Sequence, residues 1–387
     1  MIDLSVNLPI LEAQHGVVRC ALAAAFADEN SVRRTALGGA LEVDTTTRSI
    51  LSEGLARSGW RPAPEMLVLA PGAKHALAAA LEATVPRGGI LGVEVLSYPT
   101  VRVIAAELGI RCRPLAMDDG GIRPDAVLEA HVQEPLAAVY LQPTLHNPLG
   151  MTMSAARRRQ VAEAVSRCGI LAIEDTVFEF LCPDAPPPLA AFAPKSTVLI
   201  DSLSKRLSPG LNLGFAVAPD EDLGRRIHEV LDARRWEPAG LAVTSARTLM
   251  ATGVLTQIVQ GKRSDAALRN AQARRSLAGR EVEGHAGAYH LWLSVPAWPS
   301  AAAFAAAAAA EGVLVAPADG FHFAATAPPK AVRIALGGIP LEVLESALGL
   351  VADLAGRPPG GGRKPSVPRP ARPVPGRGRP HNLGPDT

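Results

Sequence analysis

The stretch Asp201-Ser202-Leu203-Ser204-Lys205-Arg206-Leu207-Ser208-Pro209-Gly210-Leu211-Asn212-Leu213-Gly214 follows a short apolar run, 197–200, that is typical of a buried strand. Lys205 therefore stands just past a predicted strand end, between the hydroxyls of Ser202 and Ser204. A lysine that is held on rigid structure and kept partly neutral can condense with an aldehyde, and neutral donors beside it can hold a phosphate. A lysine in an exposed loop is the competing interpretation, and this stretch alone does not decide between the two.

The pattern around this stretch predicts an α/β fold. Between about residues 65 and 219, short apolar runs alternate with helical stretches, which is typical of strands wound by crossover helices into a mostly parallel sheet. The predicted strands are 66–69, 90–93, 136–140, 170–173, 198–200 and 214–217, and the predicted helices are 74–84, 100–108, 124–131 and 154–167. Ligands bind such sheets at the carboxyl ends of the strands, so we expect the site there.

The remainder of the chain predicts a smaller α+β domain. Helices are expected over 221–235, 241–259, 264–279, 300–311 and 341–354, and strands over 290–295, 313–315 and 332–336. The expected organisation is an N-terminal segment of the small domain (1–40), a large α/β domain (41–220), the small domain itself (221–355) and a tail (356–387). Because the tail is rich in Pro, Gly and Arg, we expect it to be disordered.

Composition limits the possible classes of function. The chain is 48% hydrophobic and 20% charged, which is enough for a substantial core. No apolar run is long enough for a membrane span and no secretion signal is visible at the start, so a cytoplasmic protein without a membrane partner is expected. Its four scattered cysteines do not suggest a metal or redox motif.

The net charge of +2 is unevenly distributed. Residues 356–387 hold seven Lys or Arg residues and one Asp, so residues 1–355 carry a net charge of −4. A mildly acidic folded part argues against a nucleic-acid partner.

Four motif elements occur in a fixed order along the chain. They are Ala70-Pro71-Gly72-Ala73-Lys74-His75-Ala76-Leu77; Glu94-Val95-Leu96-Ser97-Tyr98-Pro99-Thr100; Pro143-Thr144-Leu145-His146-Asn147-Pro148-Leu149-Gly150 with Ile173-Glu174-Asp175-Thr176-Val177-Phe178; and the Lys205 stretch with Val332-Arg333-Ile334-Ala335-Leu336. Together they resemble the class I and II aminotransferases of fold type I, which use pyridoxal 5′-phosphate (PLP), and most of all the aminotransferase domain of MocR-like proteins. The resemblance runs from about Ile2 to Leu354.

The resemblance implies a set of cofactor contacts. The backbone amides of Ala73 and Lys74, after Gly72, would bind the phosphate at a helix N-terminus. Ser202 and Ser204 would add hydroxyl donors, and Lys205 would form a Schiff base with the aldehyde.

Two further residues would control the cofactor ring. Tyr98 would stack on the ring and keep water from one face. Asp175 would pair with the pyridine nitrogen and keep it protonated, so that the ring can accept electrons from the substrate's Cα bond.

The resemblance also implies how the substrate is held. Asn147 would donate a hydrogen bond to the ring oxygen O3′, and Arg333 would bind the carboxylate of an α-amino acid through its planar guanidinium. The expected substrate is therefore an α-amino acid or amine. Enzymes of this fold generally work as homodimers, so a homodimer is expected as well.

The chain departs from the family pattern at two positions inside the expected site. Phe178 stands where a tyrosine usually donates to O3′, and Asn212 stands where an arginine usually binds the phosphate. Loss of a charged phosphate contact costs about 1.5–3 kcal/mol unless another group replaces it. Arg206, Lys74 and a residue from a second subunit are the candidate replacements.

MocR-like proteins usually carry a winged helix-turn-helix ahead of this domain, whereas the resemblance here begins at about Ile2. A stand-alone aminotransferase is therefore the leading expectation. A PLP-dependent lyase, decarboxylase or oxidative deaminase is an alternative, because these reactions begin from the same chemistry. A non-catalytic PLP-binding sensor is the alternative from another class.

Overall fold

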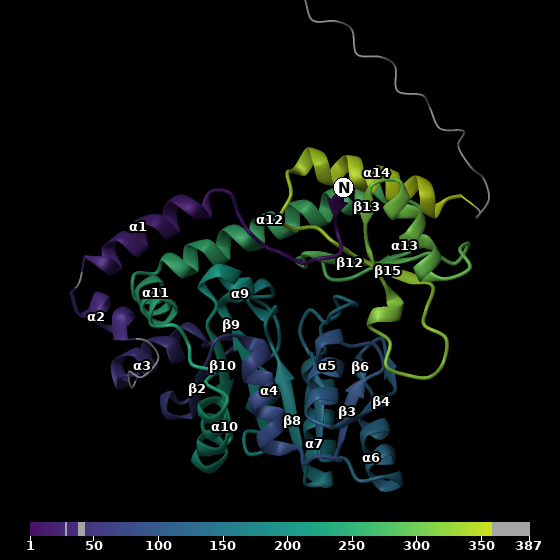
Figure 1. Cartoon of the computed structure of the whole chain (residues 1–387). Coiled ribbons are helices and arrows are strands. Elements are labelled where there is room, and N and C mark those ends of the chain that lie inside the picture. Colours follow the sequence, from purple (N-terminus) through teal and green to yellow (C-terminus); the bar gives the residue numbers. More distant parts are fainter. Residues whose placement is uncertain (28, 38–42, 358–387) are drawn as a thin grey trace, which may run out of the picture.

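A computed structural model describes residues 1–27, 29–37 and 43–357 (Figure 1). The tail was predicted over 356–387, and its residues 358–387 lie outside the described residues, as does part of the predicted 1–40 segment. The fold contains a seven-stranded sheet flanked by helices and a smaller four-stranded sheet that packs against the C-terminal part of a long helix.

The seven-stranded sheet confirms the predicted α/β class. Its order is β2 (Leu67–Ala70), β10 (Gly214–Val217), β9 (Thr197–Ser202), β8 (Leu171–Asp175), β7 (Ala138–Leu141), β3 (Ile90–Glu94) and β4 (Arg111–Leu115). β10 is antiparallel to both of its neighbours, and the other pairs are parallel. β4 was not predicted, because this edge strand carries Arg111, Arg113 and Pro114 instead of an apolar run.

Helices pack on both faces of this sheet. α4 (Ala73–Thr84), α5 (Pro99–Glu107) and α10 (Glu221–Ala233) share one buried cluster with the strands, whereas α6 (Pro124–Gln133) and α7 (Ala155–Cys168) share another. α10 lies against α4, so the elements after residue 220 begin by covering the large sheet.

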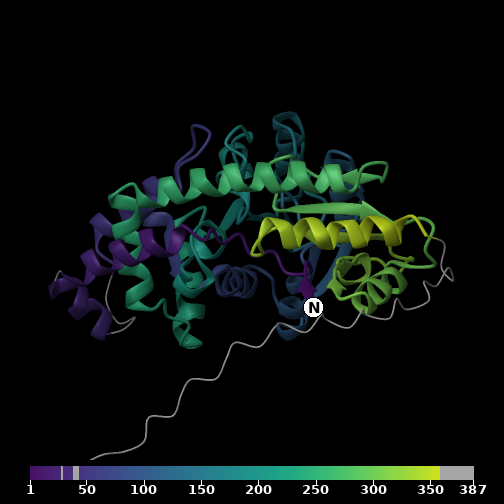
Figure 2. The same ribbon diagram turned by 90° about the horizontal axis from the view of Figure 1, so that it is seen from above.

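A long helix connects the two sheets. α11 (Gly240–Ala251) is separated by Thr252 and Gly253 from α12 (Val254–Ser276), which then runs without a break; Gly253 has a left-handed φ of 72°. The predicted helices 241–259 and 264–279 were therefore wrong in their boundaries, since the break lies at Gly253. Leu255 and Ile258 of α12 pack in the core of the large sheet, while Ala273 packs in the core of the small sheet. Figures 1 and 2 show the long course of α12 across the molecule.

The small sheet has the order β11 (Val282–Glu283), β12 (His290–Ser294), β15 (Ala331–Ala335) and β14 (Ala316–Pro317), and α13 (Ala301–Ala310) and α14 (Leu341–Ala355) cover it. The N-terminal strand β1 (Ile2–Asp3) pairs in parallel with β13 (Val313–Leu314). Next along the chain, the amide of Ala335 donates to the carbonyl oxygen of Leu4 at 2.7 Å. The first residues therefore run beside β15 and toward the large sheet.

The remaining elements are short or peripheral: α1 (Gln14–Phe26), α2 (Glu29–Leu37), α3 (Thr45–Gly54), β5 (Met117–Asp118), β6 (Gly121–Ile122), α8 (Leu189–Phe192) and α9 (Leu203–Arg206). α1 and α2 project from the body beside α11 (Figure 2). Within the described ranges, no helix has both the length and the apolar character to cross a bilayer.

Candidate functional site

Strand register places three predicted site segments at the same edge of the large sheet. Gly214 of β10 pairs with Ala70 of β2 on one side and with Ser202 of β9 on the other. Because β10 runs opposite to both neighbours, the residue two positions before it, Asn212, meets the segments that follow β2 and β9. Gly72 and Lys205 therefore lie in the same neighbourhood as Asn212.

The first turn of α4 is open and uncapped. Gly72 precedes the helix without a capping side chain, and its carbonyl accepts from the amides of His75 and Ala76. Among the described residues, no hydrogen-bond partner is found for the amides of Ala73 and Lys74, which belong to the turn where a helix leaves its N–H groups free. This arrangement suits an anion.

Two glycines make room beside this turn. A Cβ atom at Gly72 would lie 2.2 Å from Nδ2 of Asn212, and one at Gly214 would lie 2.2 Å from the carbonyl carbon of Gly72 and 2.7 Å from the amide nitrogen of Ala73. A side chain at Gly72 would therefore displace the Asn212 side chain, and one at Gly214 would crowd the amide of Ala73. Oδ1 of Asn212 is itself buried without a hydrogen-bond partner.

Lys205 lies on the short helix α9, whose N-cap hydroxyl, Ser202 Oγ, contacts Ser204 Oγ at 2.7 Å. Its Nζ donates to the carbonyl oxygen of Asn7 at 2.5 Å and lies 6.0 Å from the ring centroid of Phe178. Burial, helped by the positive charges of Arg333 and Lys74, lowers the pKa of Lys205 to about 8. The amine therefore loses its proton more easily than an exposed lysine does, as a nucleophile or base requires.

Lys262 of α12 holds the turn that carries Lys205. It is fully buried, and its Nζ donates to the carbonyl oxygens of Lys205 at 2.9 Å and of Leu207 at 2.8 Å. Burial, and to a smaller extent the charge of Lys205, lowers the pKa of Lys262 to about 7. Lys262 was not predicted as a site residue. Its spacing does indicate burial, because it lies four residues after Ile258 and four before Ala266, on the buried face of a helix.

Asp175 ends β8 as predicted and is buried. Its Oδ2 accepts a 2.7 Å hydrogen bond from the hydroxyl of Tyr140, and its Oδ1 accepts from the amide of Val177 at 3.2 Å. Burial raises the pKa of Asp175 to about 6, and the bond from Tyr140 opposes this shift. Tyr140 was not predicted as a site residue, because the sequence shows it only as part of the apolar run of β7.

Arg333 of β15 reaches Asn147. Its Nη1 donates to Asn147 Oδ1 at 2.8 Å, and its Nη2 donates to the carbonyl oxygen of Ser5. Its Nε is buried without a partner, and no carboxylate within the described chain forms an ion pair with it. Burial lowers the pKa of Arg333 to about 10. A buried cation of this kind favours a bound anion.

His290 connects Asn7 with the loop of Asn147. Its Nε2 lies 3.1 Å from the carbonyl oxygen of His146, which can only accept, so Nε2 carries the hydrogen. Nδ1 then accepts from Asn7 Nδ2 at 3.3 Å. Burial and the nearby Arg333 lower the pKa of His290 to about 3, so the ring stays neutral. His290 and Asn7 were also missed. No motif contains either residue, and nothing in the sequence links position 290 with position 7.

The remaining predicted residues surround this centre. Tyr98 is the N-cap of α5; burial raises its pKa, and the charges of Asp175 and Arg333 both act on it. Phe178 is buried, with its ring 5.8 Å from that of His290. The structure therefore brings together the segments of all four predicted motifs.

Arg206 does not lie free beside Asn212. Its guanidinium donates to Asp201 Oδ2 at 2.8 Å and to the carbonyl oxygen of Gly54 at 3.0 Å. Asp201 also pairs with Arg57 at 3.1 Å, and Arg57 pairs with Glu179 at 2.8 Å. This buried network removes Arg206 from the candidate replacements for the phosphate arginine.

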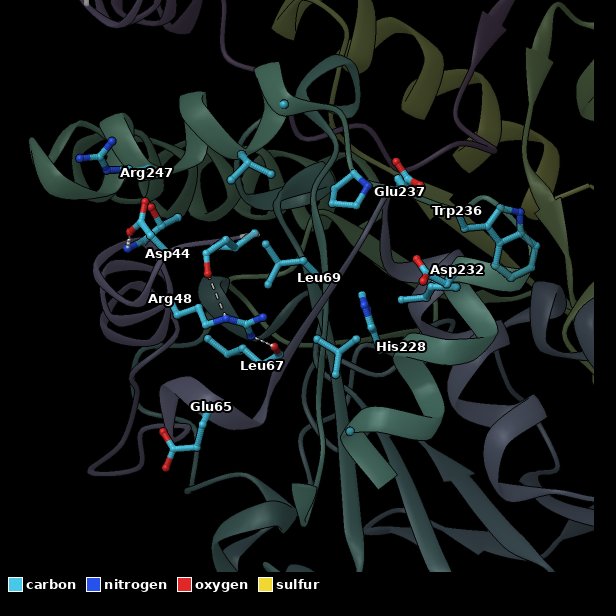
Figure 3. A pocket seen from close by; sticks show the side chains of 18 of the residues that line it. Asp44, Arg48, Glu65, Leu67, Leu69, His228, Asp232, Trp236, Glu237 and Arg247 are labelled. Atoms are coloured by element: carbon cyan, nitrogen blue, oxygen red, sulfur yellow. Dashed lines mark hydrogen bonds between the residues drawn. The ribbon is translucent and has the colours of Figure 1, made fainter. Parts of the chain in front are cut away.

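A cavity of about 650 Å³ lies elsewhere, at the open edge of β2 (Figure 3). Asp44, Arg48, Leu67, His228 and Trp236 are among its lining residues, and Arg48 donates to the carbonyl oxygens of Leu67 and Val43. It contains none of the predicted site residues, so it is separate from the centre around Lys205.

Comparison with known proteins agrees with this geometry. A family model described as aminotransferase class I and II matches residues 1–350. An uncharacterized HTH-type transcriptional regulator, YdeF of Bacillus subtilis, is 30% identical over 293 residues, which cover 76% of this chain and 63% of the regulator. The HTH-type pyridoxine biosynthesis transcriptional regulator PdxR of Corynebacterium glutamicum is 29% identical over 200 residues, 51% of this chain and 42% of PdxR. The chain thus spans 63% or less of the length of both relatives.

Solved structures share the fold. An archaeal alanine:glyoxylate aminotransferase superposes with a TM-score of 0.83 at 21% identity, covering 92% of this chain and 90% of that chain. LysN, the α-aminoadipate aminotransferase of Thermus thermophilus, superposes with a TM-score of 0.81 at 20% identity, covering 92% of each chain.

Proposed function

This chain belongs to the class I and II aminotransferase family, and we propose that it is a PLP-dependent enzyme that transfers the amino group of an α-amino acid or amine. The family match confirms the resemblance deduced from the motifs. The proposal rests on one observation above all: Lys205, Asp175, Asn147 and Arg333 converge on one edge of the sheet, and Arg333 is a buried cation without a carboxylate partner in the described chain.

The residues fit PLP. The free amides of Ala73 and Lys74, the Asn212 side chain and the hydroxyls of Ser202 and Ser204 would form a set of phosphate ligands, and Gly72 and Gly214 let the Asn212 side chain and the backbone of the turn approach one another closely. When bound, PLP supplies an aldehyde that condenses with amines and a ring that accepts electrons from the substrate's Cα bonds.

The protein's own groups would position the reactants and move the proton. Arg333, with Asn147 beside it, would hold the substrate carboxylate, which fixes the orientation of the Cα–H bond. The Lys205 amine, with its lowered pKa, would take the proton from Cα and return it. Asp175, oriented by Tyr140 and the Val177 amide, would hold a proton at the ring nitrogen. Tyr98 would cover one ring face and exclude water.

Lys205→Ala tests this assignment. The variant should lose the visible absorbance that wild type gains with PLP and should lose turnover, because no other residue replaces the amine. Lys195→Ala, an exposed lysine outside the site, is the matched control and should behave as wild type. Retained turnover in Lys205→Ala would reject the assignment. Assays for amino transfer to a 2-oxo acid, ammonia release, carbon dioxide release and peroxide release separate the aminotransferase from the lyase, decarboxylase and oxidative deaminase alternatives.

A PLP-binding sensor is the second candidate, and the names of the relatives favour it: YdeF and PdxR are HTH-type regulators. A sensor needs binding without turnover, whereas the enzyme needs both. Rapid mixing of the PLP-loaded protein with one equivalent of amino acid decides between them. Formation of the 2-oxo acid in a single turnover supports the enzyme.

We further propose a cytoplasmic homodimer. Val17, Phe26 and Val32 expose 37–43% of their surface on α1 and α2, and such projecting apolar side chains suit contact with a second copy. Sedimentation should show a dimer that Phe26→Asp and Val32→Asp weaken.

A further inference from the structure

We propose that the ammonium of Lys74 neutralises the cofactor phosphate and so takes over the charge that Asn212 lacks. This inference rests on the proposed function, because it concerns the phosphate of the same cofactor. It assigns to the Lys74 side chain a role beyond the contact expected of its backbone amide.

The other phosphate ligands are all neutral. They are the amides of Ala73 and Lys74, the Asn212 amide group and the hydroxyls of Ser202 and Ser204. A phosphate monoester carries between one and two negative charges at neutral pH. Neutral donors and a helix N-terminus reduce the cost of binding it, but a cation is the stronger partner.

The neighbouring cations are occupied, with one exception. Arg206 and Arg57 pair with Asp201, Lys262 donates to two backbone carbonyl oxygens, and Arg333 is held by Asn147 and Ser5. Lys205 would be occupied by the cofactor aldehyde.

Lys74 differs from these groups. It is exposed, and no hydrogen bond or ion pair with its side chain is found in the described part of the chain. It is the second residue of α4, so its side chain starts from the same turn as the free amides. Its positive charge also contributes to the lowered pKa of Lys205, which places the ammonium within electrostatic reach of the site.

The next residue does not compete for this role. The His75 ring packs edge-on against Trp236, with 5.1 Å between centroids, and burial lowers the pKa of His75. His75 is therefore neutral and turned toward the α4–α10 layer. Lys74 alone supplies a mobile positive charge at this helix end among the described residues.

A comparison of two aldehydes, one with and one without a phosphate, measures the contribution of the phosphate to binding. Purified wild type, Lys74→Gln, Asn212→Arg and the double variant would be titrated with PLP and with pyridoxal, which lacks the phosphate, while bound aldehyde is followed by visible absorbance. Lys195→Gln is the matched control, since it makes the same change at a remote exposed lysine.

We expect Lys74→Gln to weaken PLP binding by about tenfold to a hundredfold, the range for loss of a charged hydrogen bond, and to leave pyridoxal binding unchanged. Asn212→Arg should restore PLP binding in the Lys74→Gln background. The Lys195→Gln control should match wild type with both aldehydes.

Two results would overturn the proposal while the proposed function stands. In one, Lys74→Gln binds PLP as tightly as Lys195→Gln does. In the other, it loses affinity equally for PLP and pyridoxal, which would mean that Lys74 acts through Lys205 and not through the phosphate. If wild type gains no absorbance with either aldehyde, the proposed function itself fails, and the role of Lys74 fails with it.

Discussion

The hydroxyl of Tyr140 donates a 2.7 Å hydrogen bond to Oδ2 of Asp175, and both side chains are buried. A donor to a carboxylate stabilises its charged form, so Tyr140 counteracts the burial that raises the pKa of Asp175 to about 6. The tyrosine therefore helps to keep Asp175 ionised at neutral pH, where its proposed role requires a negative charge.

Tyr140→Phe should raise the pKa of Asp175 further. Loss of a hydrogen bond to a charged group costs about 1.5–3 kcal/mol, which corresponds to roughly 1–2 pKa units. Activity should fall at pH 7 and recover toward pH 8.5, and the acidic limb of the kcat/KM profile reports the shift. Tyr289→Phe is the comparison: it removes another buried tyrosine hydroxyl, which donates to Asp265 and to the Lys262 carbonyl oxygen and not to Asp175, so the acidic limb should stay where it is in wild type. An acidic limb identical to that of wild type would remove Tyr140 from this role.

Asp175→Asn should inactivate the enzyme but stabilise the cofactor-free protein at neutral pH. The pKa of Asp175 is raised from 3.8 to about 6 on folding, so folding favours its protonated form. Its contribution to stability is therefore present below about pH 4 and is lost as pH rises to about 6. Urea unfolding at pH 4.5 and 7 should show the variant gaining roughly 1–3 kcal/mol relative to wild type at the higher pH. A pH-independent difference would contradict the raised pKa.

Phe178→Tyr should lower the pKa of the Schiff base that Lys205 would form with PLP. The Phe178 ring lies near Lys205 Nζ, and a phenol at this position would donate to O3′ and stabilise its anionic form. A spectral titration of the PLP-loaded variant measures the effect, with Phe192→Tyr, which lies outside the site, as control. An unchanged titration would show that residue 178 does not reach O3′.

Arg333→Gln should raise KM for an amino acid by about tenfold to a hundredfold, since a charged hydrogen bond contributes about 1.5–3 kcal/mol. The control is a second substrate, an amine that lacks the carboxylate, which should react equally well with the wild type and the variant. If the variant kept the preference for the amino acid over the corresponding amine, Arg333 would not be the carboxylate ligand.

Lys262→Met should loosen the turn that carries Lys205. Methionine retains the length of the side chain but removes the Lys262 donor from the Lys205 carbonyl oxygen and leaves the Leu207 carbonyl oxygen with the Gln14 amide as its donor. Hydrogen exchange at the amides of Leu207 and Ser208, which both bond to the Leu203 carbonyl, should become faster, and turnover should fall. The amides of β8 are the internal reference. Equal acceleration in β8 would indicate general destabilisation instead of a local effect.

Much of the fold follows from the sequence because the central strands are continuous apolar runs and the helices between them have clear starts. β4 escaped prediction because it lies at the sheet edge and its side chains alternate charged and apolar. The helix break at Gly253 depends on one left-handed residue, which a helical pattern of apolar residues does not reveal.

The candidate site likewise contains residues that the sequence predicts and residues that it does not. Lys205, Asp175, Asn147 and Arg333 stand in motifs at strand ends, or on a strand in the case of Arg333, so their types and spacing point to them. The residues that were not predicted act through distant partners. The separations along the chain are 35 residues for Tyr140 and Asp175, 57 for Lys262 and Lys205, 198 for Asn7 and Lys205, and 283 for His290 and Asn7. Contacts at such separations arise from the three-dimensional packing, and no local pattern encodes them.

The path of the first eight residues has a mechanical consequence. Ile2 is clamped to β13, and within five residues the same backbone presents the carbonyl of Ser5 to Arg333 and that of Asn7 to Lys205. A displacement of Ile2 would therefore shift the two carbonyl oxygens that accept hydrogen bonds from Arg333 and Lys205, and a displacement of either side chain would act on the same stretch of backbone. The leading segment of the polypeptide therefore joins β13 to the two cations of the site through one short stretch of backbone.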